Sequence, residues 1–206
     1  MSITIVLCIV IGFVSYQAFE KPALFHKLKH YPYAEVRENE YFRWVTSMFV
    51  HGDYTHLFIN LFVFWQLGTV VENRFMALFG ESGSIYFILL FFLSGVFADL
   101  PTFFQHKDNE VFASVGASGA VAGVLMAYVL FYPWQWFLFP PLPGFLIGIG
   151  YILYSTWADK NRQGRVNHSA HLYGALFGLW FTIAVGDGIF SDFIEMMMHP
   201  EPPPFF

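Results

Sequence analysis

Apolar residues in this chain come in runs of about membrane length, separated by polar stretches. The first run covers residues 3–19 and contains no charged residue. Five further runs follow, at 54–71, 83–98, 118–132, 144–158 and 168–185. A segment of roughly 17–25 apolar residues is what a membrane-spanning helix needs. The pattern therefore predicts six transmembrane helices, with a long polar and aromatic loop over 20–53 between the first two.

The connections between these runs show no room for a soluble domain. Residues 133–143 read PWQWFLFPPLP; proline stops helices and tryptophan favours the headgroup level, so we expect an interfacial connection there. The first run lacks a basic start and a cleavage site, which predicts a retained helix and not a signal peptide. We expect one membrane domain over 1–190 and a disordered tail over 191–206.

Composition supports the same class. Hydrophobic residues make up 56% of the 206 residues and charged residues 12%, about half the charged share of a soluble protein. The predicted fold class is an all-α membrane protein with a six-transmembrane-helix bundle. The formal net charge of -5 comes with no basic stripe, so nucleic acid binding has no support. The single cysteine, Cys8, excludes an internal disulfide.

The fourth run begins at a serine. It holds about 15 residues, or roughly 22 Å of helix, which is short of the ~30 Å hydrocarbon layer. A helix that starts below the surface leaves its first N–H groups unpaired, so that end must be buried in protein or line a wet cavity. Ser118 lies at this end, in ASVGASGAVAGV.

The sixth run offers a base for that hydroxyl. His171 lies near its start, and both runs carry glycines four residues apart: Gly119 with Gly123, and Gly174 with Gly178. Such small-x-x-x-small faces permit close backbone approach of two helices. If the two faces meet, Ser118 and His171 lie at a similar depth and can interact.

The second run adds further polar groups. His56 and Asn60 are four apart and share one helical face, and His51 precedes them at the loop end. Polar residues within spans tend to face inward and to mark function. Three polar faces at one end of a bundle predict a small wet cavity.

These residue types suit nucleophilic catalysis. A serine is activated when neutral imidazole takes its proton, and a helix N-terminus favours developing negative charge. His56 and Asn60 can donate hydrogen bonds to an oxyanion. Because Asp99 and Asp159 fall near the ends of other segments, we predict a Ser118–His171 dyad with no third acid, no metal and no cofactor.

Together these pieces resemble the rhomboid intramembrane serine proteases. The matching stretches are Arg43 with TSMF at 46–49, HGDYTHLFIN at 51–60, GASGA at 116–120 and AHLYGALFG at 170–178. Their order and spacing cover nearly the whole chain.

The resemblance implies cleavage of transmembrane protein substrates in the lipid bilayer, with Ser118 as nucleophile and His171 as base. His56, Asn60 and Gly116 would stabilise the oxyanion together with the N–H of Ser118. Structural roles near the site would fall to His51, Arg43, Gly119 and Gly174. The segment 144–158 and the loop 159–167 would form a gate. A multi-pass protein of the bacterial inner membrane is the expected setting, and the oligomeric state is left open.

The chain departs from the family pattern in three ways. Ala122 stands where members often carry an aromatic that packs on the catalytic histidine, so what holds His171 is open. Phe42 replaces the usual tryptophan before Arg43. All lysines and arginines except Arg74 fall in loops on the predicted active-site face, which by the positive-inside rule would be cytoplasmic, whereas the family usually opens that face to the outside.

Three alternatives remain. His51, His56, His168 and His171 could gather around zinc, although His168 is expected to be solvated at the loop. The chain could be an inactive relative that binds membrane proteins without cleaving them. A transporter would need more intramembrane charges than the spans carry.

Overall fold

The computed structural model describes residues 2–161 and 167–200, and this part of the chain is helical throughout its regular structure. The long helices are α1 (Ile3–Glu20), α5 (Tyr54–Phe79), α6 (Ser82–His106), α7 (Ser118–Phe131), α8 (Gly144–Lys160) and α9 (His168–Val185). The shorter ones are α2 (Pro22–Leu28), α3 (Pro32–Arg37), α4 (Arg43–Thr46), the 3₁₀ helix η1 (Ser47–Phe49) and α10 (Ile189–Met198).

Each of the six predicted apolar runs forms one of the long helices. Five of the starts agree to the residue, because α1, α5, α7, α8 and α9 begin at Ile3, Tyr54, Ser118, Gly144 and His168. The predicted ends of the second and third runs were too early. α5 continues to Phe79 because Glu72 is turned inward, where its carboxylate binds the start of α1. α6 continues through Pro101 to His106, where it packs against α3.

Multi-pass insertion in a membrane is supported by length and composition. In the described part of the chain, α1, α5 and α6 are each long and apolar enough to cross a bilayer, and α9 with α10 qualifies as one bent pair with an angle of 107°. α7 is apolar but has only 14 residues. Three spans, or four with the bent pair, are thus supported, and the count of six stays a prediction.

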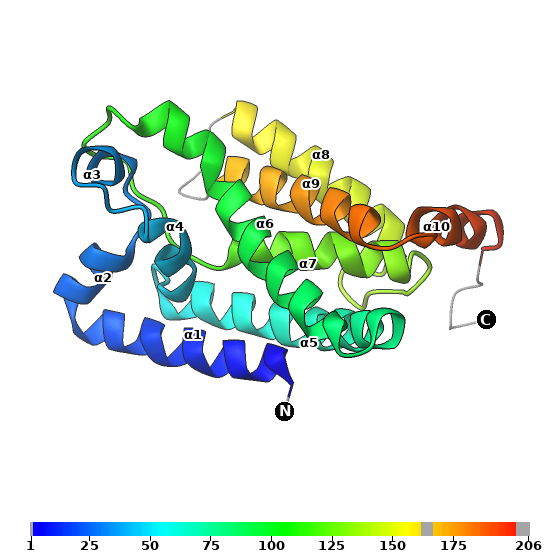
Figure 1. Ribbon diagram of the computed structural model, residues 1–206. Coiled ribbons are helices and arrows are strands. Elements are labelled where there is room, and N and C mark those ends of the chain that lie inside the picture. The colour runs from blue at the N-terminus through cyan, green and yellow to red at the C-terminus, as the bar shows by residue number, and fades with distance from the viewer. Residues whose placement is uncertain (1, 162–166, 201–206) are drawn as a thin grey trace.

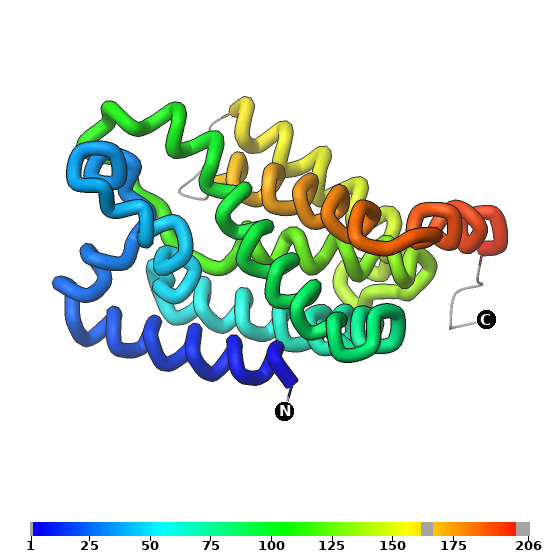
Figure 2. Tube along the Cα trace, in the orientation of Figure 1, coloured from blue at the N-terminus to red at the C-terminus, as the bar shows by residue number. Residues whose placement is uncertain are grey.

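The helices are arranged around α7, which is buried along nearly its whole length. It packs against α5, α6, α8 and α9, whereas α1 lies outside against α5 (Figure 1). Glycine, alanine and valine dominate its sequence, SGAVAGVLMAYVLF, and such small side chains let several neighbours approach one central helix. The starts of α5, α7 and α9 lie at one end of the bundle, which also carries α2 to α4, while α10 lies at the other end (Figure 2).

The prediction of a disordered tail over 191–206 was wrong for residues 191–198, which belong to α10. This helix is amphipathic: Ile189 is buried, and the side-chain N–H of Trp134 donates a hydrogen bond to the carbonyl of Met196 at 2.8 Å. One apolar face and one anchoring hydrogen bond are enough to order a short helix against the bundle. Residues 201–206 lie outside the described part.

Candidate active site

The glycine faces of α7 and α9 meet. A Cβ placed on Gly174 would overlap the backbone carbonyl of Gly119, and one placed on Gly178 would overlap the backbone of Gly123. The two helices thus touch backbone to backbone along two turns, as the small-x-x-x-small spacing permits. Ser118 directly precedes Gly119, and His171 lies about one turn before Gly174, so both polar residues stand at the beginning of contacting helices.

The two side chains themselves are half-buried at this junction. Among residues 2–161 and 167–200, no direct hydrogen bond joins Ser118 to His171, whose backbone N–H donates to the carbonyl of Asn167 at 3.3 Å. Catalytic hydrogen bonds are often long or poorly aligned before substrate binds. The backbone contact of α7 with α9 is therefore the feature that brings Ser118 and His171 to the same place.

His56 lies next to the turn that leads into α7, the helix that begins with Ser118. Gly116 has a φ of +116°, which disfavours any residue with a Cβ. A Cβ at Gly116 would lie 2.6 Å from Cε1 and 2.9 Å from Nε2 of His56. The imidazole of His56 therefore packs on the bare Cα of Gly116, two residues from Ser118.

The start of α5 holds His56 in place. The carboxylate of Asp53 caps the helix by accepting the backbone N–H of His56 at 2.7 Å. The Asn60 side chain is buried, and its Nδ2 donates to the carbonyl of His56 at 2.9 Å.

His51 connects three parts of the site. Its Nδ1 lies 2.9 Å from Oγ of Ser15, which itself donates to the carbonyl of Phe49 and so accepts from the Nδ1–H. Its Nε2 accepts the backbone N–H of Ala117 at 3.3 Å. Burial, aided by the neighbouring His56, lowers the pKa of His51 to about 3, so the ring is neutral and can accept. His51 thereby fixes the residue before Ser118 to α1.

Arg43 holds the loop between α1 and α5. Its guanidinium donates to the carbonyls of His26 at 2.8 Å and Lys29 at 3.1 Å, and to the carboxylate of Glu40 at 2.7 Å. These contacts tie α2 to α4 above the end of the bundle where Ser118 lies.

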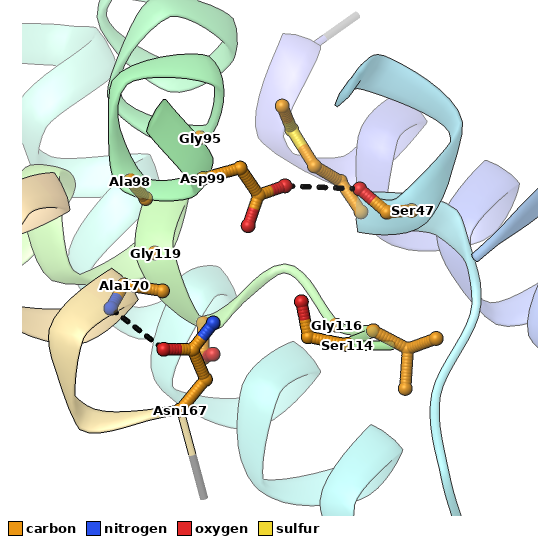
Figure 3. A pocket seen from close by; sticks show the side chains of 12 residues that line it. Ser47, Gly95, Ala98, Asp99, Ser114, Gly116, Gly119, Asn167 and Ala170 are labelled. Carbon is orange, nitrogen blue, oxygen red and sulfur yellow. Dashed lines mark hydrogen bonds between the residues drawn. The ribbon is translucent and has the colours of Figure 1, made fainter. Parts of the chain in front are cut away.

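A small polar pocket adjoins Ser118; the sequence predicted a small wet cavity at this end of the bundle, but not the residues that line this pocket. Its volume is about 20 Å³, enough for one water molecule. Ser47 donates to the carboxylate of Asp99 at 3.3 Å across the pocket (Figure 3). Among residues 2–161 and 167–200, the Ser114 hydroxyl and the Asn167 Nδ2 are buried and have no hydrogen-bond partner, and both line the same pocket. Because these residues come from four separate segments, no spacing in the sequence indicated them.

The histidines form two pairs instead of one cluster. The ring centroids of His51 and His56 are 4.9 Å apart, and those of His168 and His171 are 5.9 Å apart. Within the described residues, no group of three or more histidine, cysteine or acidic side chains is arranged to hold a metal. The expectation that His168 is solvated was wrong: it is 8% exposed, because the ring of Tyr154 packs edge-on against it.

The sequence places this arrangement in a known family. A family model described as the rhomboid domain matches residues 38–188, which include every element of the site except Ser15 and the start of the loop. The chain belongs to the rhomboid family.

Rhomboid proteins of several organisms are similar to the chain. It is 32% identical over 152 residues to the Rhomboid-like protein 11, chloroplastic, of Arabidopsis thaliana, covering 68% of this chain and 50% of that protein. It is 28% identical over 142 residues to the Presenilin-associated rhomboid-like protein, mitochondrial, of Rattus norvegicus, covering 66% and 36%. It is 27% identical over 153 residues to the Rhomboid protease GluP of Bacillus subtilis, covering 73% and 27%.

The chain spans half or less of the length of these rhomboid relatives. Their names also include chloroplast and mitochondrion, so the expectation of a bacterial inner membrane is not borne out. What holds for this rhomboid chain is a multi-pass, membrane-embedded helical domain.

Proposed function

We propose that this chain is an intramembrane serine endopeptidase, with Ser118 as nucleophile and His171 as general base. The observation that carries the proposal is the backbone contact between Gly119 and Gly174. It sets the starts of α7 and α9 side by side, so a serine on one helix and a histidine on the other face the same end of the bundle.

The first half of the reaction would form an acyl-enzyme. His171 takes the hydroxyl proton while Oγ of Ser118 attacks the scissile carbonyl carbon, giving a tetrahedral oxyanion. Collapse of this intermediate breaks the C–N bond, and the leaving amine takes the proton from the imidazolium. The carbonyl carbon is then esterified to Ser118.

The second half would hydrolyse that ester. A water gives its proton to His171 and attacks the acyl carbon, after which Ser118 regains its proton and the new carboxyl end leaves. The pocket beside Ser118 has the size and polarity to hold such a water, with Asp99, Ser114 and Asn167 in its wall. A water held there would lie next to the acyl group on Ser118.

The oxyanion would be stabilised where α5 meets the start of α7. His56 and Asn60 lie on one face of α5, and the first N–H groups of α7, beginning with Ser118, carry the positive end of the helix dipole. Gly116 lets the His56 ring approach this point because it lacks a Cβ.

The substrates proposed are membrane proteins cleaved in or near a transmembrane segment. A peptide bond within a helix is hydrogen-bonded and shielded, so segments that unwind easily are favoured. Small residues at the scissile bond are what the resemblance to the rhomboid proteases implies. α8 and the following loop are the proposed gate; residues 162–166 of that loop lie outside the described part of the chain.

Reconstituted protein tests this function. Wild type should cleave a single-span substrate in vesicles, and a fluorophosphonate should label Ser118 in detergent. Ser118→Ala and His171→Ala should each abolish cleavage while melting as wild type does. A substrate that binds but is never cut, with no labelling, would identify a non-catalytic binder. Cleavage lost to a chelator but kept by Ser118→Ala would identify a metal enzyme.

A further inference from the structure

The ring of His171 is held by aromatic contacts. Within residues 2–161 and 167–200, no carboxylate or other side chain forms a hydrogen bond with this imidazole. Its ring neighbours are Tyr151, stacked at 6.1 Å between centroids and 20° between planes, and His168, edge-on at 5.9 Å. A stacked neighbour restricts ring rotation because only one face-to-face orientation keeps the contact.

Tyr151 belongs to α8, and its place beside His171 depends on small residues in α7 and α9. Ala122, Met126 and Ala175 form a buried cluster on which Tyr151 packs. A larger side chain at residue 122 would occupy space next to this cluster. The alanine instead leaves that space to the ring supplied by α8.

The seating of α8 on α7 brings the tyrosine to this position. A Cβ at Gly148 would lie 3.2 Å from the Val129 side chain and 3.5 Å from Met126, so the glycine allows close packing of α8 on α7. Tyr151 follows three residues later, on the same side of the helix. Where α8 sits therefore decides whether the ring reaches His171.

We infer that Tyr151 is a positioning residue for the general base, and this rests on the proposed function. Its ring holds the imidazole of His171 toward Ser118. The orientation of His171 therefore depends on where α8 lies. A shift of α8 away from α7 removes the stacked partner and leaves the imidazole free to turn. The phenolic hydroxyl has no part in this role.

Matched variants separate ring stacking from general packing. Tyr151→Phe keeps the ring and should cleave and label with fluorophosphonate as wild type does. Tyr151→Leu removes it and should lower kcat and the labelling rate by about 10- to 100-fold, with KM unchanged, because the base is misplaced. Tyr154→Leu makes the same change on the same helix, at a ring that is tilted against Trp157 and edge-on to His168, and it should leave both rates near wild type.

Two further variants keep the test decisive. If Tyr151→Leu does not fold, Tyr151→Met supplies an unbranched side chain of similar length, and the same loss is expected. Combining Tyr151→Ala with Ala122→Phe returns a ring to the cluster from α7 and should recover labelling relative to Tyr151→Ala alone.

The outcomes are distinguishable. Folded Tyr151→Leu or Tyr151→Met that labels as fast as wild type overturns the role of Tyr151 and leaves the dyad intact. A loss of equal size in Tyr151→Phe also overturns it, since the ring is still present. Wild type that neither cleaves nor labels overturns the proposed function itself, and with it this inference.

Discussion

The backbone of Gly119 in α7 touches the backbone of Gly174 in α9. No side chain fits between the two helices at this point: a Cβ on Gly174 would meet main-chain atoms of Gly119, which cannot turn aside. The start of each helix carries one member of the proposed dyad, so the contact that stabilises the bundle also sets the geometry of the site.

Gly174→Ala is therefore expected to destabilise the fold by about 1–3 kcal/mol, as overpacking does, and to abolish most cleavage by separating Ser118 from His171. Gly150→Ala is the matched control, because a Cβ there meets nothing within 4 Å. It should be neutral or stabilising by up to about 1 kcal/mol, since alanine favours helix. Melting temperature in detergent and cleavage rate measure both. Equal melting of the two variants would contradict the packing account.

Gly116→Ala should impair the chemistry more than the fold. The added Cβ meets the imidazole of His56 and requires a backbone with φ of +116°. His56 must then turn away from the start of α7, so the rate of cleavage should fall by about 10-fold or more. Gly52→Ala, with open space around its Cα, is the control. Full activity in Gly116→Ala would show that His56 does not stabilise the oxyanion.

Asn60→Ala should lower kcat by on the order of 10- to 1000-fold if the amide supplies one oxyanion donor. The structure adds a competing role, because Nδ2 donates to the His56 carbonyl. Asn60→Asp keeps a similar shape but loses both N–H donors, so it should be as impaired as alanine. Single-turnover cleavage at saturating substrate measures the effect. An unchanged rate in both variants would leave Asn60 with a packing role alone.

Glu72 fastens α1 to α5 far from the dyad. Its carboxylate accepts the Ile3 N–H at 2.7 Å, the Thr4 N–H at 2.9 Å and the Thr4 hydroxyl at 2.7 Å. Glu72→Ala leaves these donors without their acceptor, which should cost about 1–3 kcal/mol of stability. Glu81→Ala, at an exposed position, serves as the control. Denaturant titration tests this, and equal unfolding midpoints for the two variants would show that the hydrogen bonds of Glu72 contribute nothing to stability.

Stability should depend on pH in opposite senses through two histidines. Burial opposes protonation of His30, but the carboxylates of Asp99 and Glu35 outweigh it and raise the pKa of His30 above its ordinary 6.5. The folded state therefore gains stability that is complete below pH 6.5 and is lost as the pH rises through the folded pKa. His30→Gln should remove this alkaline decline in melting temperature.

His51 acts on the acid side. Its pKa of about 3 in the folded protein lies below the unfolded value, so the unfolded chain binds a proton that the folded chain does not. Melting temperature should fall as the pH drops from about 6.5 toward 3. His51→Gln should remove this fall in melting temperature on the acid side and leave the decline on the alkaline side unchanged. If melting temperature falls with pH below 6.5 as steeply in His51→Gln as in wild type, His51 is not the cause of the fall.

Local features of the sequence predicted how the helices pack around the candidate site. Ser118 at the start of its apolar run and the glycines at 119 and 174 are short-range signals: helix length and side-chain size follow from neighbours within a turn or two. They were sufficient to predict where α7 begins and that α7 and α9 touch. The ends of α5 and α6 were misjudged because a buried charge such as Glu72 reads as a boundary unless its partner in α1 is known.

By itself, then, the sequence determined which segments are apolar helices, which of their faces can approach closely, and which residues bear a hydroxyl or an imidazole there. Only the tertiary structure decided that Tyr151 of α8 stacks on His171 where Ala122 leaves room, and that Asp99 and Asn167 line a pocket beside Ser118. The physical reason is that these are contacts between residues far apart in the chain. Their pairing is fixed by how the helices pack, and no local pattern encodes it.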